Sequence, residues 1–424
     1  MKTKTRFLAL LTLVLLFQFF TNCSKTEYVS GNSLDRLNWS ERNYQVLNQM
    51  ILDNGLGGKY YHKGEIPYIV LDWDQTCAHF DVEEAVMRYQ LFNLRFKCSV
   101  AQFKSLLKDT INGITQLSDE YKGIRLADIN ADLMNDYQFI LDNYNGFNGK
   151  MTLEEMKATP RFNDFVTRML FLADGYMGTT GIGMSYVYEW ELFLFAGFTV
   201  EEVRAMAKEA ISYELANQIG RHTLESPAGL TTLAGRVTCS FNSGLRVFPE
   251  MQNLITTCRD YGIEVYIVSA SYKPVVEVFG GIGTFGYNLP ADHVIGMELS
   301  IGADGKIIPE YKAGWVKTVR AGKVEAINQV IKSQPGKNHD PLFAGGDSDG
   351  DIEMLTQFPG MKLALIWNRV KGGEIGALCK QAVAEMESQS PRFILQGRNE
   401  NTGIAMPSSE SILLGKTQPE LLRK

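Results

Sequence analysis

Several features that define easily recognised protein classes are scarce or missing in this sequence. It has only six cysteines and no CxxC pair, so neither zinc ligation nor a dense disulfide framework is indicated. Lysine and arginine form no run, and the formal net charge is -6, which argues against non-specific binding of nucleic acid. What is present is a globular composition: 45% of the 424 residues are hydrophobic, enough for two or three domains or for one domain with a large insertion.

The N-terminal segment 1–22 has the proportions of a signal peptide. It starts with three basic side chains and continues as an apolar run, Phe7 to Phe20, that is too short for a comfortable membrane span. Cys23 follows at a position that resembles the lipidation site of bacterial lipoproteins, although Asn22 replaces the small residue expected there. We therefore predict export to the periplasm or outer membrane of a Gram-negative bacterium, with an acyl anchor on Cys23 as the only membrane contact. The alternative is a plain secretory signal with an incidental cysteine.

Short apolar runs that end in polar residues recur along the chain and predict buried strands. They are Pro67–Asp72, Glu264–Ser269, Pro341–Gly346 and Lys362–Trp367, and Asp292–Ile308 is expected to form a hairpin. Helical periodicity separates the later strands. This alternation predicts an α/β fold, with a Rossmann-like, mostly parallel sheet and a site at the C-terminal ends of its strands.

The first predicted strand is separated from the second by a long insertion. Residues 81–240 show mostly helical periodicity and no clear strand-turn-strand pattern, so we expect a helical cap domain there. Residues 23–60 are expected to form a tether and an entry helix, while 61–80 and 241–424 form the α/β core. A large helical insertion directly after a strand that carries acids predicts a cap that covers the site and excludes water.

Four polar clusters lie at predicted strand ends or at a helix start. They are Asp72-Trp-Asp74-Gln-Thr76, Ser269, Lys323 and Asp347-Ser-Asp349-Gly-Asp351. Two carboxylates two residues apart can act as a nucleophile and as a proton donor. A strand-end hydroxyl can bind a phosphate oxygen, an ammonium group can offset its charge, and an acidic motif suits a hard divalent cation.

These four clusters, in this order, resemble the four motifs of the phosphatases of the haloacid dehalogenase superfamily. The resemblance covers residues 66–80 and 262–369, together with the position of the cap. One such motif is weak evidence, whereas four in the expected order are strong evidence. The dehalogenase branch lacks the second aspartate of the first motif, so Asp74 favours phosphoryl transfer.

The resemblance implies Mg2+ as cofactor and a reaction in two displacements. Asp72 attacks phosphorus and forms an aspartyl-phosphate, and Asp74 protonates the leaving oxygen and then activates water. Ser269 and Lys323 hold the phosphoryl oxygens. The implied metal ligands are the Asp72 carboxylate, the Asp74 backbone carbonyl and Asp347, with Asp351 in support.

Some assignments have alternatives. Ser271 could replace Ser269, although strand phasing favours Ser269, and Lys317 could replace Lys323. Thr76 and Ser271 are further hydroxyl groups expected to contact the substrate.

The acidic motif could also be a calcium loop. However, Gly350 stands at the fourth loop position and Phe358 at the twelfth, unlike an EF-hand. Asp349 is expected to be a solvated turn residue.

The substrate is expected to be a small phosphomonoester. The segment 194–203 resembles one in phosphatases that act on phosphocholine and phosphoethanolamine, and phosphoserine phosphatases share the architecture. Aromatic faces and carboxylates in the cap suit an ammonium head group, and we select Tyr186 and Trp190 as substrate-binding residues. Further candidates are Trp73, Tyr176, Tyr188, Glu189 and Glu191, although packing of the cap core explains any single aromatic. A non-catalytic lipoprotein that binds a phosphorylated ligand, or a phosphotransferase, is the alternative function.

Overall fold

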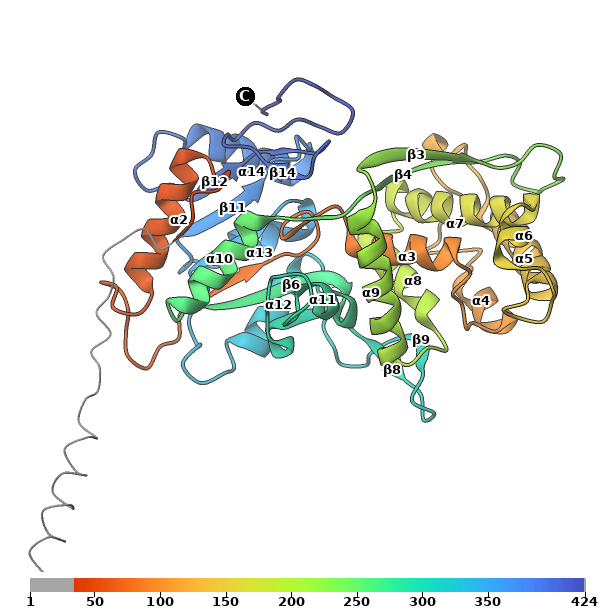
Figure 1. Ribbon diagram of the computed structural model, residues 1–424, viewed down its shortest axis with the longest axis horizontal. Helices are drawn as coiled ribbons and strands as arrows, with labels where there is room; N and C mark the ends of the chain where they lie inside the picture. The colour runs from red at the N-terminus through yellow and green to blue at the C-terminus, as the bar shows by residue number, and fades with distance from the viewer. Residues whose placement is uncertain (1–33, 423–424) are drawn as a thin grey trace, which may run out of the picture. The chain divides into compact units, whose positions relative to one another are not determined.

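A six-stranded sheet forms the centre of the core in this computed structural model, which describes residues 34–422 (Figure 1). The strand order is β12-β11-β10-β1-β6-β7, and every neighbouring pair is parallel. The strands are β1 (Tyr68–Leu71), β6 (Glu264–Tyr272), β7 (Val294–Met297), β10 (Phe343–Gly346), β11 (Leu363–Trp367) and β12 (Phe393–Gln396). The predicted α/β fold with a mostly parallel sheet is confirmed. The predicted signal peptide and Cys23 lie outside the described residues.

Helices cover both faces of this sheet because its strands are apolar on both sides. Ile69 and Leu71 of β1 belong to one hydrophobic cluster, and Tyr68 and Val70 belong to another. The helices α2 (Glu41–Asn54), α10 (Pro249–Asp260) and α11 (Lys273–Gly280) contribute to the first cluster. The second receives α12 (Ala321–Ala326), which continues as a π-helical turn (Ile327–Ile331), together with α13 (Ile352–Thr356) and α14 (Gly373–Ala384).

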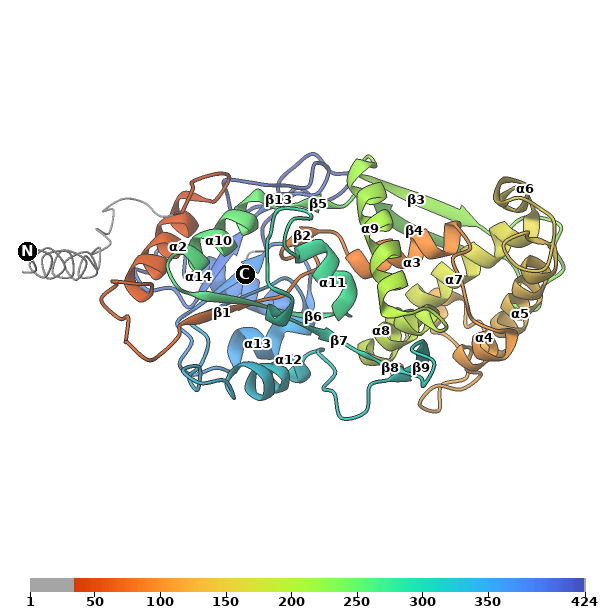
Figure 2. The same ribbon diagram turned by 60° about the horizontal axis from the view of Figure 1, so that its bottom comes forward.

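The cap follows β1 in sequence and lies beside the core (Figures 1 and 2). Its helices are α3 (Val82–Phe92), α4 (Val100–Leu106), α5 (Leu126–Asn143), α6 (Leu153–Lys157), α7 (Pro160–Gly178), α8 (Met184–Leu192) and α9 (Val200–Ala216). Short 3-10 turns lie at Asp119–Tyr121 and Phe193–Phe195. The cap has its own hydrophobic cluster, but α3 and α9 also place side chains in the core cluster and so connect the two.

Two sequence expectations for β-structure need correction. The cap contains an antiparallel hairpin of β3 (Gly220–Glu225) and β4 (Thr238–Ser243), where only helices were expected. Both strands are largely polar, so they carry no apolar run to predict them. The hairpin predicted at 292–308 is in fact β8 (Leu299–Ile301) and β9 (Ile307–Tyr311), while β7 just before it joins the central sheet.

Short strands complete the core near the C-terminal ends of the sheet strands. They are β2 (Ala78–His79), which pairs with β5 (Arg246–Val247), and β13 (Arg398–Asn399), which pairs with β14 (Ile404–Ala405). Short 3-10 turns lie at Ala291–His293 and Asp349–Asp351. The five described cysteines are buried free thiols, and no described helix is both long enough and apolar enough to cross a membrane.

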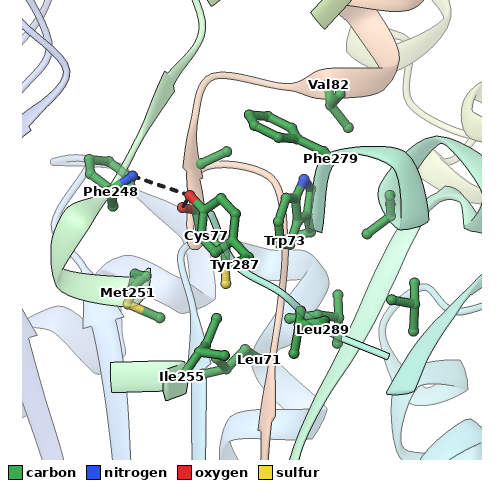
Figure 3. Close-up of a cluster of buried hydrophobic side chains, with 14 of the residues drawn as sticks. Leu71, Trp73, Cys77, Val82, Phe248, Met251, Ile255, Phe279, Tyr287 and Leu289 are labelled. Atoms are coloured by element: carbon green, nitrogen blue, oxygen red, sulfur yellow. Dashed lines mark hydrogen bonds between the residues drawn. The ribbon is translucent and has the colours of Figure 1, made fainter. Parts of the chain in front are cut away.

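Trp73 anchors the loop that leaves β1. Its buried ring makes edge contacts with Tyr287 and Phe279, at centroid distances of 4.8 and 5.3 Å (Figure 3). The Tyr287 hydroxyl donates a hydrogen bond to the Cys77 carbonyl and accepts one from the Phe248 backbone amide. The tryptophan therefore points into the core, and its two neighbouring aspartates are free to face the other way.

Candidate active site

Asp72 is the first residue after β1 and lies at the centre of a buried polar cluster. The residue is 6% exposed. Lys323 Nζ donates to Asp72 Oδ1 over 2.5 Å, and Thr76 Oγ1 donates to Asp72 Oδ2 over 3.0 Å. Lys323 comes from the first turn of α12, so two distant segments meet at this carboxylate.

Asp351 fixes the same lysine and the turn after β10. Its Oδ1 accepts from Lys323 Nζ over 2.7 Å. Its Oδ2 accepts from the backbone amides of Asp347 and Ser348, each over 3.1 Å. Both carboxylate oxygens of Asp351 therefore accept hydrogen bonds from Lys323 or from the backbone, which fits the supporting role expected for it.

Asp347 completes a group of carboxylates that suits a divalent cation. Oxygen atoms of Asp72, Asp347 and Asp351 lie within 4.8 Å of one another, and all three residues are buried. Arg369 Nη1 donates to Asp347 Oδ2 over 2.6 Å. Hard oxygen donors gathered in a buried site are the ligand set that Mg2+ prefers, so these residues fit the implied metal.

Asp74 lies between the core and the start of the cap. The Val82 backbone amide, at the first residue of α3, donates to Asp74 Oδ1 over 2.7 Å. Ser271 Oγ, near the end of β6, donates to Asp74 Oδ2 over 2.6 Å. Since both oxygens are held, the carboxyl group has one defined orientation beside Asp72.

Burial dominates the electrostatics of the two loop acids. It raises the pKa of Asp72 to about 8, with Asp351 adding to the rise and Lys323 opposing it. Burial, Asp81 and Asp72 raise the pKa of Asp74 well above its ordinary value. A protonated Asp74 beside a nucleophile is the arrangement that a general acid needs.

The charges around these acids favour the charged forms of two further groups. Burial alone would raise the pKa of Asp347, but Arg369 and Lys371 outweigh it and lower the pKa. Burial would lower the pKa of Lys323, but Asp351 and Asp72 raise it, so the lysine stays charged. The site therefore keeps an ionised Asp347 and a fixed ammonium group beside Asp72.

A cavity of about 360 Å³ opens onto this cluster between the core and the cap. Its lining holds nine carboxylates and three basic side chains. The core contributes Asp72, Asp74, Gln75, Ala270, Ser271, Val319, Lys323, Asp347–Asp351, Arg369, Lys371, Gly372 and Ile375, and the cap contributes Asp81, Glu83, Glu84, Met177, Met184, Tyr188 and Glu191. The excess of acids favours a ligand that carries positive charge.

The structure brings Asp72, Asp74, Lys323, Asp347 and Asp351 together as expected from the sequence. Two of the expected hydroxyl groups lie elsewhere. Ser269 and Thr76 are fully buried and do not line the cavity. Thr76 lies behind Asp72, and Ser269 Oγ accepts from the Ser271 amide over 3.1 Å. Ser271, the sequence alternative, is the serine of β6 that faces the cavity.

The cap residues selected from the sequence also need correction. Trp190 is 1% exposed and makes an edge contact with Tyr176, which also contacts Tyr186. Tyr186 and Trp190 pack in the cap cluster and do not line the cavity, whereas Tyr188 and Glu191 of the same helix do.

Two other expectations concern residues at the edge of the site. Lys317, the alternative to Lys323, pairs with Glu189 and does not line the cavity. Asp349 is half-buried rather than solvated, because its side chain accepts from the Ile375 amide at the start of α14.

Arg369 and Lys371 were missed from the sequence. They follow β11, and nothing local marks them as site residues. Asp81, Glu83 and Glu84 stand at the start of α3, where acids are common as caps. The sequence resemblance to phosphatases of phosphocholine and phosphoethanolamine extends to these three acids, nine to twelve residues after Asp72, and all three line the cavity.

The chain is similar to several known proteins. Residues 185–356 match the model of the haloacid dehalogenase-like hydrolases. A phosphorylcholine phosphatase from Pseudomonas aeruginosa is 27% identical over 111 residues, which are 26% of this chain and only 29% of that protein. A conserved protein of unknown function from Anaerococcus prevotii has a crystal structure that is similar over 92% of this chain and 100% of its own, with 29% identity and a TM-score of 0.82.

Proposed function

Since residues 185–356 match the model of the haloacid dehalogenase-like hydrolases, we propose that the chain is a Mg2+-dependent phosphatase that cleaves small phosphomonoesters through an aspartyl-phosphate. The observation that carries this proposal is the pair of carboxylates on one loop. Asp72 and Asp74 leave the same strand end and face the same cavity, beside a buried lysine and a cluster of acids. A site that only binds phosphate has no need for two carboxylates facing it.

In the first step, an oxygen of Asp72 forms a bond to phosphorus as the bond to the leaving oxygen breaks. Lys323 Nζ offsets charge on the phosphoryl group, and Asp74 gives its proton to the leaving oxygen. When bound by Asp72, Asp347 and the Asp74 carbonyl, Mg2+ supplies charge that reduces the repulsion between carboxylate and phosphate.

In the second step, Asp74 takes a proton from water, whose oxygen attacks the phosphoryl group and releases Asp72. Asp74 must therefore exist in both protonation states. Ser271 suits both, because its hydroxyl can donate to the carboxylate and can turn to accept from the acid.

We also propose that the substrate carries an ammonium group, as phosphocholine, phosphoethanolamine and phosphoserine do. Glu191 is 7% exposed and lines the cavity, and its carboxylate has no hydrogen bond or ion pair among the described residues. Burial, Glu84 and Asp81 raise its pKa well above the ordinary value. A cation beside Glu191 would offset the cost of ionising this buried carboxyl group, and the face of Tyr188 suits such a cation.

Lys371 favours an amino-acid substrate over an amino-alcohol substrate. It is exposed at the cavity and has no hydrogen bond or ion pair among residues 34–422. A free ammonium group beside an ammonium-binding wall favours a substrate with a second anionic group, such as the carboxylate of phosphoserine. Phosphoserine hydrolysed faster than phosphoethanolamine, which lacks only this carboxylate, would support that choice.

The direct test is a phosphate-release assay on phosphoserine, phosphoethanolamine, phosphocholine and p-nitrophenyl phosphate, with and without chelator. We expect turnover that needs Mg2+, and full activity after exhaustive chelation would refute the metal site. E191Q should raise KM for the ammonium substrates more than for p-nitrophenyl phosphate. E154Q, at an exposed cap position, is the matched control.

Phosphotransfer to an acceptor other than water uses the same residues. Product analysis with an added alcohol separates the two reactions, because transfer yields a new phosphate ester. A protein that binds the panel and releases no phosphate would instead be a binding lipoprotein.

Export remains part of the proposal. The basic and apolar segment 1–22 and Cys23 support a periplasmic or outer-membrane location. Labelling with a fatty-acid analogue tests the anchor, and C23A should abolish the label.

A further inference from the structure

The C-terminal segment 397–422 reaches the loop that carries Asp72 and Asp74, although the proposed chemistry assigns it no role. Arg398 of β13 is fully buried. Its Nη1 donates to the Gln75 backbone carbonyl over 2.9 Å, and its Nη2 donates to Gln75 Oε1 over 2.6 Å. One guanidinium group therefore holds both the main chain and the side chain of a residue 323 positions earlier in sequence.

Gln75 needs such a partner because its backbone is in a strained conformation. Its φ is +62°, in the left-handed region that non-glycine residues rarely adopt. It stands directly between Asp74 and Thr76, so a change in its φ would move the Asp74 carbonyl and carboxyl together. Thr76, which donates to Asp72 Oδ2, would move as well.

The magnitudes show that the guanidinium group is sufficient to hold this conformation. The left-handed region disfavours a non-glycine residue by about tenfold. A hydrogen bond from a charged donor favours the paired state by about tenfold to a hundredfold, and Arg398 makes two to Gln75. The contacts therefore outweigh the strain.

Arg398 is itself fixed from the side away from the loop. Its Nη2 also donates to Glu400 Oε1 over 2.9 Å, and its backbone amide donates to Ser411 Oγ over 2.9 Å. Ser411 Oγ in turn donates to the Asn368 carbonyl, next to the arginine that holds Asp347. The same segment thus supports both loops that carry the acids.

We propose that Arg398 is a positioning residue of the active site: it keeps Gln75 in the left-handed conformation and so holds Asp74 in its working orientation. This inference rests on the proposed function only in naming Asp74 as the working acid. The effect on the loop is independent of any activity.

The test compares R398K, which keeps the charge and loses the planar fork, with R125K, the same change at an exposed cap arginine that makes two contacts to Asp128. For R398K we expect kcat to fall about tenfold or more, as for loss of one charge-assisted hydrogen bond, with a smaller change in KM. Hydrogen–deuterium exchange in residues 72–82 should become faster. R125K should stay near wild type in both measurements.

A second substitution distinguishes positioning from general packing. Glycine adopts positive φ without steric cost, so adding Q75G to R398K should restore part of the lost kcat. If the double variant recovers nothing, or if R398K matches wild type in kcat and exchange, the proposal is overturned. If R398K does not fold, Q75A removes one of the two contacts and should still speed exchange in residues 72–82; wild-type exchange in Q75A would overturn the proposal.

Different results would refute the proposed phosphatase activity and the positioning role of Arg398. Wild-type protein that hydrolyses no phosphomonoester, with faster loop exchange in R398K, would refute the phosphatase and leave the positioning role. An active wild type with an unaffected R398K would do the reverse.

Discussion

Asp72→Asn should abolish turnover and, in the absence of metal, make the protein more stable. The pKa of Asp72 is raised from 3.8 to about 8 in the metal-free fold, mainly by burial. A carboxyl group with a raised folded pKa binds more protons in the folded state, so it lowers stability progressively as pH rises from about 4 to 8. At pH 7 this cost has a ceiling of about 4 kcal/mol.

The substitution also removes the ion pair with Lys323, which keeps Asp351 as its partner. The raised pKa of Asp72 already includes the opposing effect of Lys323, so this loss adds no separate term. D72N should therefore be more stable than wild type in chelator, by at most about 4 kcal/mol. Mg2+ should make wild type the more stable of the two proteins. At a hundredfold excess over its Kd it stabilises wild type by about 3 kcal/mol, whereas D72N lacks one of the metal ligands and gains less.

Thermal unfolding at pH 7, with chelator and with Mg2+, measures this crossover, and phosphate release measures turnover. D260N, the same substitution at an exposed position, should change neither. Activity in D72N would refute the nucleophile. A D72N protein less stable than wild type in chelator would refute the electrostatic argument.

Three further predictions follow from the same contacts. K323M should lose turnover and about 3–5 kcal/mol of stability, because Asp72 and Asp351 are left without their cation; a variant with wild-type Tm would contradict this. Metal-free protein should become less stable from pH 6 to 8, because the raised pKa values of Asp81, about 7, and Glu83, about 8, make the folded state bind more protons than the unfolded state; a Tm that rises over this range would contradict it. W190F should lower Tm and leave the KM ratios among substrates unchanged, since Trp190 packs in the cap and does not line the cavity; a changed ratio would return Trp190 to the substrate site.

The centre of the site was predictable because it is built from strand ends. Each parallel strand is recognisable in the sequence as an apolar run. The polar residues that end these strands all lie at one edge of the sheet. Asp72 and Asp347 follow β1 and β10, which are direct neighbours. Their meeting therefore follows from topology, without any knowledge of side-chain contacts.

The cap could not be assigned in the same way, because α8 carries aromatic side chains on two opposite faces. Tyr186 and Trp190 are four residues apart and face the cap cluster, while Tyr188 and Glu191 are three apart and face the cavity. Both spacings fit one side of a helix, so periodicity alone does not show which side meets the substrate.

Arg369 and Arg398 were hidden for a different reason. Each pairs with a residue far away in sequence, 22 and 323 positions respectively, and neither lies in a motif. The polar strands β3 and β4 were missed because their pairing comes from cross-strand contacts rather than from an apolar pattern. Such partners cannot be predicted from the local sequence.

Asp74 couples the chemistry to the cap more tightly than the sequence suggested. The first residue of α3 donates its amide to Asp74, and Glu83 in the same turn accepts from the Tyr272 amide at the end of β6 over 2.9 Å. Separating α3 from the core would break both buried hydrogen bonds, at a cost of about 1–3 kcal/mol each. The start of the cap is therefore fixed by the catalytic loop, and any opening that admits substrate must bend the cap elsewhere. If Asp74 is the proton donor that we propose, a change in how the cap contacts its ligand would reach it through a single helical turn.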